Sequence, residues 1–162
     1  MTEAFVVYTI IVKVTMTRTE ETCNTVAREC IAMRVRLLNR VVTKVYDDCL
    51  RSHGLRTAQM NILVAVSLMK SASPSEIERR LCLEKSTVSR NVNRMRRRGW
   101  LELMPGKDGR SHQLEVTREG AKLLRKATGA WQQAQEKAVS LLGKDGVESL
   151  SRIEAGLGAH RL

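Results

Sequence analysis

Residues 73–120 constrain this chain more than any other stretch, because their signals follow the order of one small fold. Ser73, Pro74 and Glu76 form the pattern of a capped helix start, with an N-cap, a first-turn proline and a capping box. After a short turn, a second helix is predicted from about Glu84. Two segments of alternating apolar residues follow this helix and predict strands.

The two predicted strands cover Trp100–Met104 and His112–Val116. Between them, residues 105–110 supply Pro, Gly and Asp for a turn, with two cations at its tip. A helix, a turn, a basic helix and a two-stranded ribbon in this order are typical of a winged helix-turn-helix. The sequence therefore predicts a mainly α fold with a small β-wing.

The second helix of this stretch combines an apolar stripe with polar and basic faces. Val88, Val92 and Met95 recur at helical spacing and are predicted to be buried. Short donors and acceptors near the helix start suit base edges in a major groove, and arginines along its flank suit phosphates. The candidate major-groove residues are Lys85, Ser86, Thr87, Ser89, Arg90 and Arg94. A charged helix face is usually only solvated, but this one coincides with a turn and a ribbon, so we expect DNA contact.

Charge and composition favour duplex DNA over other polyanions. Residues 73–112 contain ten Lys and Arg against five Asp and Glu, a surplus of five in a chain of net charge +11. Aromatic residues make up only 3% of the chain, which argues against the base-stacking surfaces of proteins that bind RNA or single strands.

The predicted winged lobe, residues 55–117, is flanked by regions that read as helices. Residues 20–54 carry apolar side chains at three- and four-residue steps, and Gly54 is the predicted stop. Residues 118–162 predict one helix, a break at 143–146 and a final helix. Both regions hold more apolar surface than one lobe can cover, so we expect them to be dimerisation helices.

Two other segments carry expectations without a function. Residues 1–19 form an N-terminal extension with the β-prone run Phe5–Val12, which we interpret as a packed strand, a flexible tail or, the favoured reading, sequence upstream of the true start. Residues 57–70 predict a compact scaffold helix. Its inward-facing residues are expected to be Met60, Leu63, Val64, Ser67 and Leu68.

Catalytic, metal and membrane functions find no support in the sequence. The cysteines Cys23, Cys30, Cys49 and Cys82 form no CxxC pair and no Cys/His metal spacing, and the three histidines are scattered. No phosphate loop, nucleophile elbow or zinc-protease motif occurs. No apolar run approaches the roughly 18 residues of a spanning helix. We therefore expect a cytoplasmic protein that is not an enzyme and has no cofactor.

Several segments together resemble the MarR family of bacterial transcriptional regulators. They are Lys85–Arg90 (KSTVSR), Arg97–Leu101 (RRGWL), Asp108 with Arg110 and Ser111, Val116–Gly120 (VTREG), and Gly54-Leu55 with Gln59. The resemblance extends over about residues 20–157 and implies a homodimer in which two winged lobes read a palindromic operator. It also implies repression that is relieved by a small-molecule effector.

The resemblance assigns roles to the wing as well. Arg110 would enter the minor groove, Asp108 would orient it, and Lys107 would add a second cation. The sequence departs from the family pattern at Arg56, where a helix-capping Thr is common, so Thr57 is expected to cap one residue late.

Two alternatives to an effector-released repressor remain. Some members of the family sense oxidants through a cysteine of the N-terminal helix, and Cys23 and Cys30 lie in the corresponding region. These thiols, about 10.5 Å apart along a regular helix, cannot pair within it, and buried, inert cysteine is the favoured interpretation. The other alternative is a non-specific architectural protein that binds DNA without reading bases.

Overall fold

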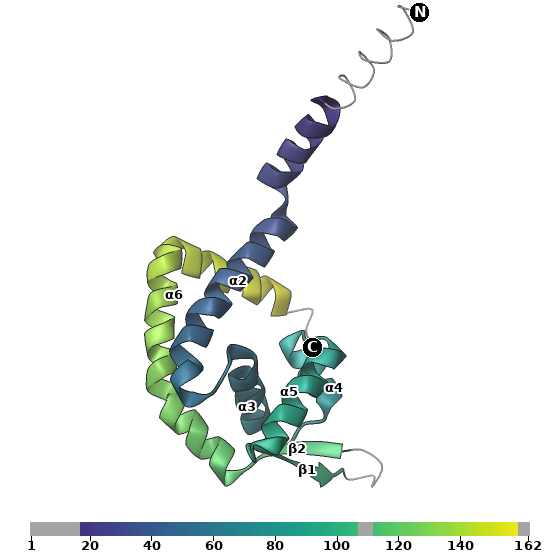
Figure 1. Ribbon diagram of the computed structural model, residues 1–162, viewed down its shortest axis with the longest axis vertical. Coiled ribbons are helices and arrows are strands. Elements are labelled where there is room, and N and C mark those ends of the chain that lie inside the picture. The colour runs from purple at the N-terminus through teal and green to yellow at the C-terminus, as the bar shows by residue number, and fades with distance from the viewer. Residues whose placement is uncertain (1–16, 107–111, 159–162) are drawn as a thin grey trace, which may run out of the picture. The chain divides into compact units, whose positions relative to one another are not determined.

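The computed structural model describes residues 17–106 and 112–158, and the chain divides into two compact units between Val41 and Val42 (Figure 1). In the first unit, residues 17–29 are helical and α2 (Ile31–Leu50) begins after a one-residue interruption at Cys30. The expectation of one unbroken helix over residues 20–54 is therefore wrong at Cys30. The 3.0 Å hydrogen bond from the Cys30 amide to the Val26 carbonyl keeps helical spacing, so the distortion is local. No Pro or Gly marks it in the sequence.

The second unit contains the end of α2 and the remaining elements. The short 3₁₀ helix η1 (Arg51–His53) follows α2, and Gly54 ends it in the left-handed conformation (φ 67°), the predicted stop. Figure 1 shows the elements that follow: α3 (Thr57–Met69), α4 (Pro74–Leu81), α5 (Lys85–Arg97), β1 (Leu101–Pro105), β2 (His112–Val116) and α6 (Arg118–Gly158).

The core of this unit lies among α3, α4, α5 and the ribbon. Its fully buried apolar side chains include Leu50, Leu55, Ile62, Leu63, Val66, Ile77, Val88, Met95 and Leu114. The predicted face of α3 is partly wrong, because Val64 and Leu68 are 40% and 70% exposed and Ser67 is exposed, while Ile62 and Val66 are buried. Apolar residues surround α3 almost completely, so three- and four-residue spacing fits more than one face.

The wing is an antiparallel pair of strands in which Leu101 lies opposite Val116 and Pro105 lies opposite His112. The first strand begins one residue later than predicted. An unexpected third segment joins the ribbon, since Ala72 and Leu114 exchange two backbone hydrogen bonds of 2.8 and 3.1 Å. This bridge fixes the loop between α3 and α4 to the base of the wing.

The start of α6 is joined to the turn between α5 and β1. Thr117 accepts a hydrogen bond from the Gly120 amide (3.0 Å), and its own hydroxyl and amide donate to the carbonyls of Gly99 (2.6 Å) and Trp100 (3.2 Å). Far along α6, Gly143 takes non-helical angles and divides the helix in two, at the predicted break. Within the described residues, no helix is long and apolar enough to cross a membrane.

Candidate nucleic-acid interface

The helix that precedes the candidate reading helix is fixed at its start by the predicted capping box. The Ser73 hydroxyl accepts from the Glu76 amide (3.4 Å), and the Glu76 carboxylate accepts from the Ser73 amide (2.7 Å). These hydrogen bonds hold the pKa of Glu76 below its ordinary value; the largest contribution is the Ser73 hydroxyl that donates to the carboxylate. Ile77 then buries its side chain completely in the core.

The turn from α4 to α5 runs through Cys82, which takes the left-handed conformation (φ 50°, ψ 44°) that glycine favours. The Leu83 amide donates to the Glu78 carbonyl (3.1 Å), and α5 begins after Glu84. The Cys82-Leu83 turn therefore separates the two helices of a helix-turn-helix, as the sequence predicts.

The buried side of α5 consists of Val88, Val92 and Met95, as predicted. Five of the six candidate major-groove residues are exposed: Lys85, Ser86, Ser89, Arg90 and Arg94. Thr87 is half-buried, and its hydroxyl lies 3.5 Å from an Arg90 guanidinium nitrogen.

The face opposite the buried stripe extends further along α5 than the candidate list. Ser86, Arg90, Asn93 and Arg97 follow each other at steps of four, three and four, and all four are exposed. Asn93 and Arg97 were not among the predicted site residues, although the spacing from Val88 indicates them. A hollow of about 500 Å³ beside them is lined by Asn93, Arg96, Arg97, Leu101, Glu102 and Leu103.

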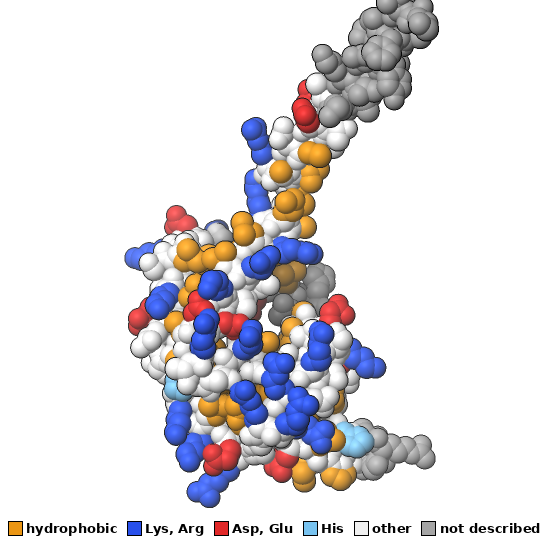
Figure 2. Space-filling view, in the orientation of Figure 1, with side chains coloured by type: hydrophobic (Ala, Val, Ile, Leu, Met, Phe, Trp, Pro, Cys, Tyr) orange, Lys and Arg blue, Asp and Glu red, His pale blue; other side chains and the backbone are white. Residues whose placement is uncertain are grey.

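The positive charge of α5 is not neutralised within the part of the chain that the structure describes. The ion pairs found there join Lys44 and Arg51 to Asp48, Arg56 to Asp47, and Lys122 to Glu119, and none involves α5. Figure 2 shows many Lys and Arg side chains across the part of this surface where α3, α4 and α5 lie. Cations without an acidic partner produce a positive potential, which attracts the phosphate backbone of a nucleic acid.

The predicted wing cations and their carboxylate, Lys107, Asp108 and Arg110, lie outside the described residues. The strands that carry the connection are well anchored, because Leu101 and Leu114 are buried in the core. The ribbon therefore starts from a fixed base.

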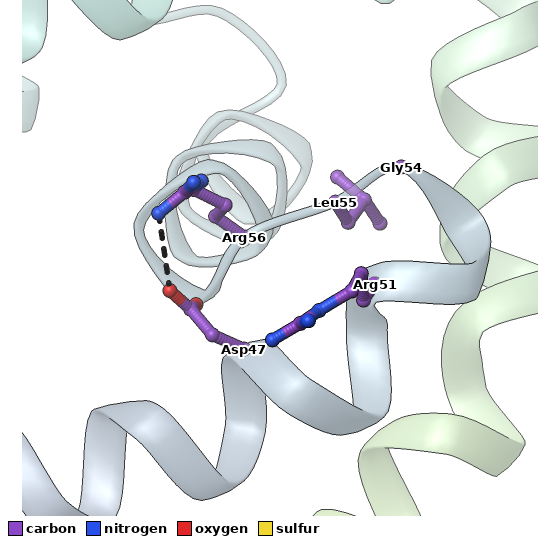
Figure 3. A pocket seen from close by; sticks show the side chains of 5 residues that line it. All are labelled: Asp47, Arg51, Gly54, Leu55 and Arg56. Atoms are coloured by element: carbon purple, nitrogen blue, oxygen red, sulfur yellow. Dashed lines mark ion pairs between the residues drawn. The ribbon is translucent and has the colours of Figure 1, made fainter.

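A second feature lies where α2 ends and α3 begins. Figure 3 shows a pocket of about 430 Å³ lined by Asp47, Arg51, Gly54, Leu55 and Arg56. Asp47 accepts hydrogen bonds of 2.7 Å from both the amide and the hydroxyl of Thr57, and its carboxylate pairs with Arg56 at 3.7 Å.

These bonds correct the expected helix cap. Arg56, not Thr57, occupies the N-cap position of α3, and Thr57 is the first residue of the helix. The carboxylate of Asp47, ten residues earlier, accepts the first amide of α3 instead. A cap supplied by another element leaves no local signal in the sequence.

The candidate redox residues are both in the first unit. Cys23 is exposed and Cys30 is half-buried at the helix interruption, and both are free thiols. The interpretation of Cys23 as a buried cysteine is therefore wrong for the single chain.

Comparisons with known proteins agree with this geometry. Residues 53–111 match the MarR family. The uncharacterized HTH-type transcriptional regulator YwoH of Bacillus subtilis is 28% identical over 83 residues, 51% of this chain and 61% of that protein, so the match spans less than two thirds of the relative.

Two solved structures extend the likeness along the chain. The transcriptional regulator MosR of M. tuberculosis, crystallised in complex with DNA, is 30% identical with a TM-score of 0.68, covering 83% of this chain and all of that one. A mutant of MarR from E. coli, complexed with operator DNA, has a TM-score of 0.72 at 17% identity, covering 82% and 96% of the two chains. Three observations agree: the family match, the 30% identity along the full length of a relative, and the order of α3, α4, α5 and the ribbon. This chain therefore belongs to the MarR family of winged helix-turn-helix transcriptional regulators.

Proposed function

We propose that this chain is a homodimeric, sequence-specific repressor that binds a pseudo-palindromic operator in double-stranded DNA. The observation that carries the proposal is the outer face of α5. Ser86, Arg90, Asn93 and Arg97 are exposed there, and neither arginine forms an ion pair with a residue that the structure describes, while the other side of the helix is buried in the core. Hydroxyl and amide groups can read base edges, and the arginines can bind bases or phosphates. The structures of MosR with DNA and of a MarR mutant with operator DNA support DNA as the ligand.

In this proposal, the wing forms the second part of the DNA-binding surface. Arg110 enters the minor groove, Asp108 orients it, and Lys107 contacts phosphate, while Lys85, Ser86, Thr87, Ser89, Arg90 and Arg94 serve the major groove. The winged lobe extends over residues 55–117, and residues 20–54 and 118–162 form the dimer.

Dimer formation is supported by apolar side chains that the single chain leaves uncovered. Ile31 and Val35, four residues apart on α2, are 73% and 58% exposed. Leu150, Ile153 and Leu157, on the part of α6 after Gly143, are 40%, 59% and 50% exposed at helical spacing. A second copy of the chain offers matching apolar stripes, and two-fold dimers are the commonest closed assembly.

The pocket at the start of α3 supports the effector part of the proposal. Arg51 and Arg56 bring two guanidinium groups to one hollow of about 430 Å³, in the size range of small-molecule sites. A ligand there contacts the end of α2 and the beginning of the winged lobe together. Binding would therefore change the direction of α5 and release the operator.

The test is selection of bound duplexes from a random pool by the purified full-length chain. A repressor of the proposed kind enriches a site with two inverted half-sites whose centres lie about one helical turn, roughly 34–36 Å, apart. Equal affinity for selected and random duplexes would instead favour the architectural alternative. Absence of any salt-dependent duplex binding would exclude both.

A further inference from the structure

Arg98, the C-cap residue of α5, is exposed like Arg97, but its side chain has partners within the fold. Its Nη1 atom donates a 2.8 Å hydrogen bond to the Gly54 carbonyl, and its guanidinium carbon lies 4.9 Å from the centre of the Trp100 ring. A cation above an indole ring is attracted by the negative face of the ring. Two separate interactions therefore hold this side chain in one position.

The backbone of Gly54 makes room for this contact. A Cβ atom at Gly54 would lie 3.2 Å from Nη1 of Arg98, closer than a side chain normally approaches, and the positive φ of 67° also favours glycine. The same residue lines the pocket described above and ends η1. Arg98 thus contacts the connection between the end of α2 and the winged lobe.

Both sides of the Arg98–Gly54 contact are anchored. On one side, the end of α2 is held to α6 by a Tyr46–Gln135 hydrogen bond and by Lys137, whose Nζ lies 3.7 Å from Cys49 Sγ. On the other side, α5 leads directly into Arg98. The guanidinium therefore connects the end of the candidate reading helix to the helices expected to build the dimer.

We propose that Arg98 is a positioning residue, which sets the direction of α5 against the end of α2 and thereby the separation of the two reading helices in the dimer. The length of α5 makes a small change in its direction large at its other end. A helix of 13 residues is about 20 Å long, so a tilt of about 10° at its C-terminal end moves its first turn by roughly 3.4 Å, one base-pair step. This inference rests on the proposed function, because spacing matters only to a dimer that reads two half-sites.

Arg97 provides the matched control. It is the next arginine back, about 100° around the helix, and lies on the outer face with Ser86 and Arg90. Its side chain makes no ion pair or hydrogen bond with a residue that the structure describes. Removing Arg97 should therefore remove a phosphate contact, whereas removing Arg98 should loosen the direction of the helix.

The experiment compares the wild-type chain with R98A, R98K and R97A on a series of duplexes. Each duplex carries the half-sites enriched by wild type from the random pool, with the spacer lengthened or shortened by one or two base pairs. For R98A we expect the preference for the best spacer over its neighbours to fall by roughly fivefold, the scale of one lost hydrogen bond, while the salt dependence stays as in wild type. R97A should weaken all spacers alike and lower the slope of log affinity against log salt by about 0.9 per phosphate lost.

R98K keeps the charge but loses the planar group above Trp100, so its spacer preference should fall between those of wild type and R98A. R98K also tests the inference if R98A does not fold, a failure that circular dichroism would reveal. Wild-type spacer preference in both variants would overturn the inference and leave the proposed function intact. A uniform loss with a reduced salt slope would make Arg98 a phosphate contact. Failure of wild type itself to select paired half-sites would remove the proposed function instead.

Discussion

Gly120, in the first turn of α6, lies against the turn before β1. A Cβ atom at this position would lie 2.2 Å from the Trp100 carbonyl oxygen and 3.0 Å from a Val116 methyl. The carbonyl belongs to the backbone and already accepts the Thr117 amide, so it cannot move without breaking the join between α6 and the wing.

Gly120→Ala should therefore destabilise the fold by about 1–3 kcal/mol, the usual cost of overpacking. The measurement is the midpoint of thermal or urea unfolding. Gly129→Ala, on the same helix with nothing within 4 Å of its Cβ position, is the control and should raise stability by up to about 1 kcal/mol. Equal midpoints for the two variants would show that α6 tolerates a side chain at the join.

Arg110 carries the wing part of the proposed function. Arg110→Ala should weaken operator binding by about 1–3 kcal/mol and lower the salt slope by about one, because one guanidinium no longer replaces a counterion in the groove. Affinity is measured by fluorescence anisotropy across a salt series. Arg152→Ala, which removes an exposed arginine from the far part of α6, is the control for net charge. Identical salt slopes for the two variants would remove Arg110 from the site.

At the scale of single elements, the start of α4 links stability to pH. The pKa of Glu76 is lowered because its carboxylate accepts from the Ser73 hydroxyl and amide. A carboxyl group whose pKa is lowered in the folded state stabilises the fold at pH values above its ordinary pKa, which is 4.5 for glutamate. That contribution is lost as the pH falls through the folded-state pKa. The wild-type chain should therefore lose part of its stability in this acid range.

Glu76→Gln should reduce the dependence of the unfolding midpoint on pH between neutral and acid conditions, because the amide can still accept a bond but does not titrate. Ser73→Ala should cost about 0.5–2 kcal/mol at neutral pH through loss of the cap. Glu78→Gln removes a charge from the same helix without touching the cap. If it flattened the pH dependence as much as Glu76→Gln, general charge and not the capping box would be responsible.

Elements whose signals are local could be predicted from the sequence. The capping box of α4, the buried stripe of α5, the Gly54 stop and the break at Gly143 each depend on residues within one or two turns. The bridge from Ala72 to Leu114 could not be predicted, because its partners are far apart in the chain and joined through backbone atoms. The cap that Asp47 supplies to α3 could not be predicted either, because its carboxylate belongs to another helix, ten residues earlier.

The candidate site also contains residues that local patterns predict and a contact that they do not predict. Periodicity predicts most of the exposed outer face of α5, and a complete count of its steps would have added Asn93 and Arg97. In the sequence, Arg98 is one more arginine beside Arg96 and Arg97, and nothing local distinguishes it. Its actual contact, the Gly54 carbonyl 44 residues earlier, depends on the packing of α5 against the end of α2.

At the scale of the whole molecule, the proposed dimer has to bury the stripe of Leu150, Ile153 and Leu157. These side chains take no part in the core of the single chain, so charges placed there should leave the winged lobe folded. Burying an apolar side chain of this kind contributes about 1.5–3 kcal/mol, and a two-fold interface buries each one twice. A double variant, Ile153→Asp with Leu157→Asp, should therefore dissociate the dimer while helical content is retained.

Light scattering coupled to size-exclusion chromatography measures the mass, and anisotropy measures binding to the selected duplex. The monomer should engage one half-site, so its salt slope should fall to roughly half the wild-type value, because half the phosphate contacts remain. Ser151→Asp introduces one such charge outside the apolar stripe of the helix and should remain dimeric. A double variant that keeps the dimeric mass would place the interface elsewhere on the chain. A monomer with the full salt slope would mean that one lobe makes all the contacts, so that the separation set by α2, α6 and Arg98 has no part in reading the operator.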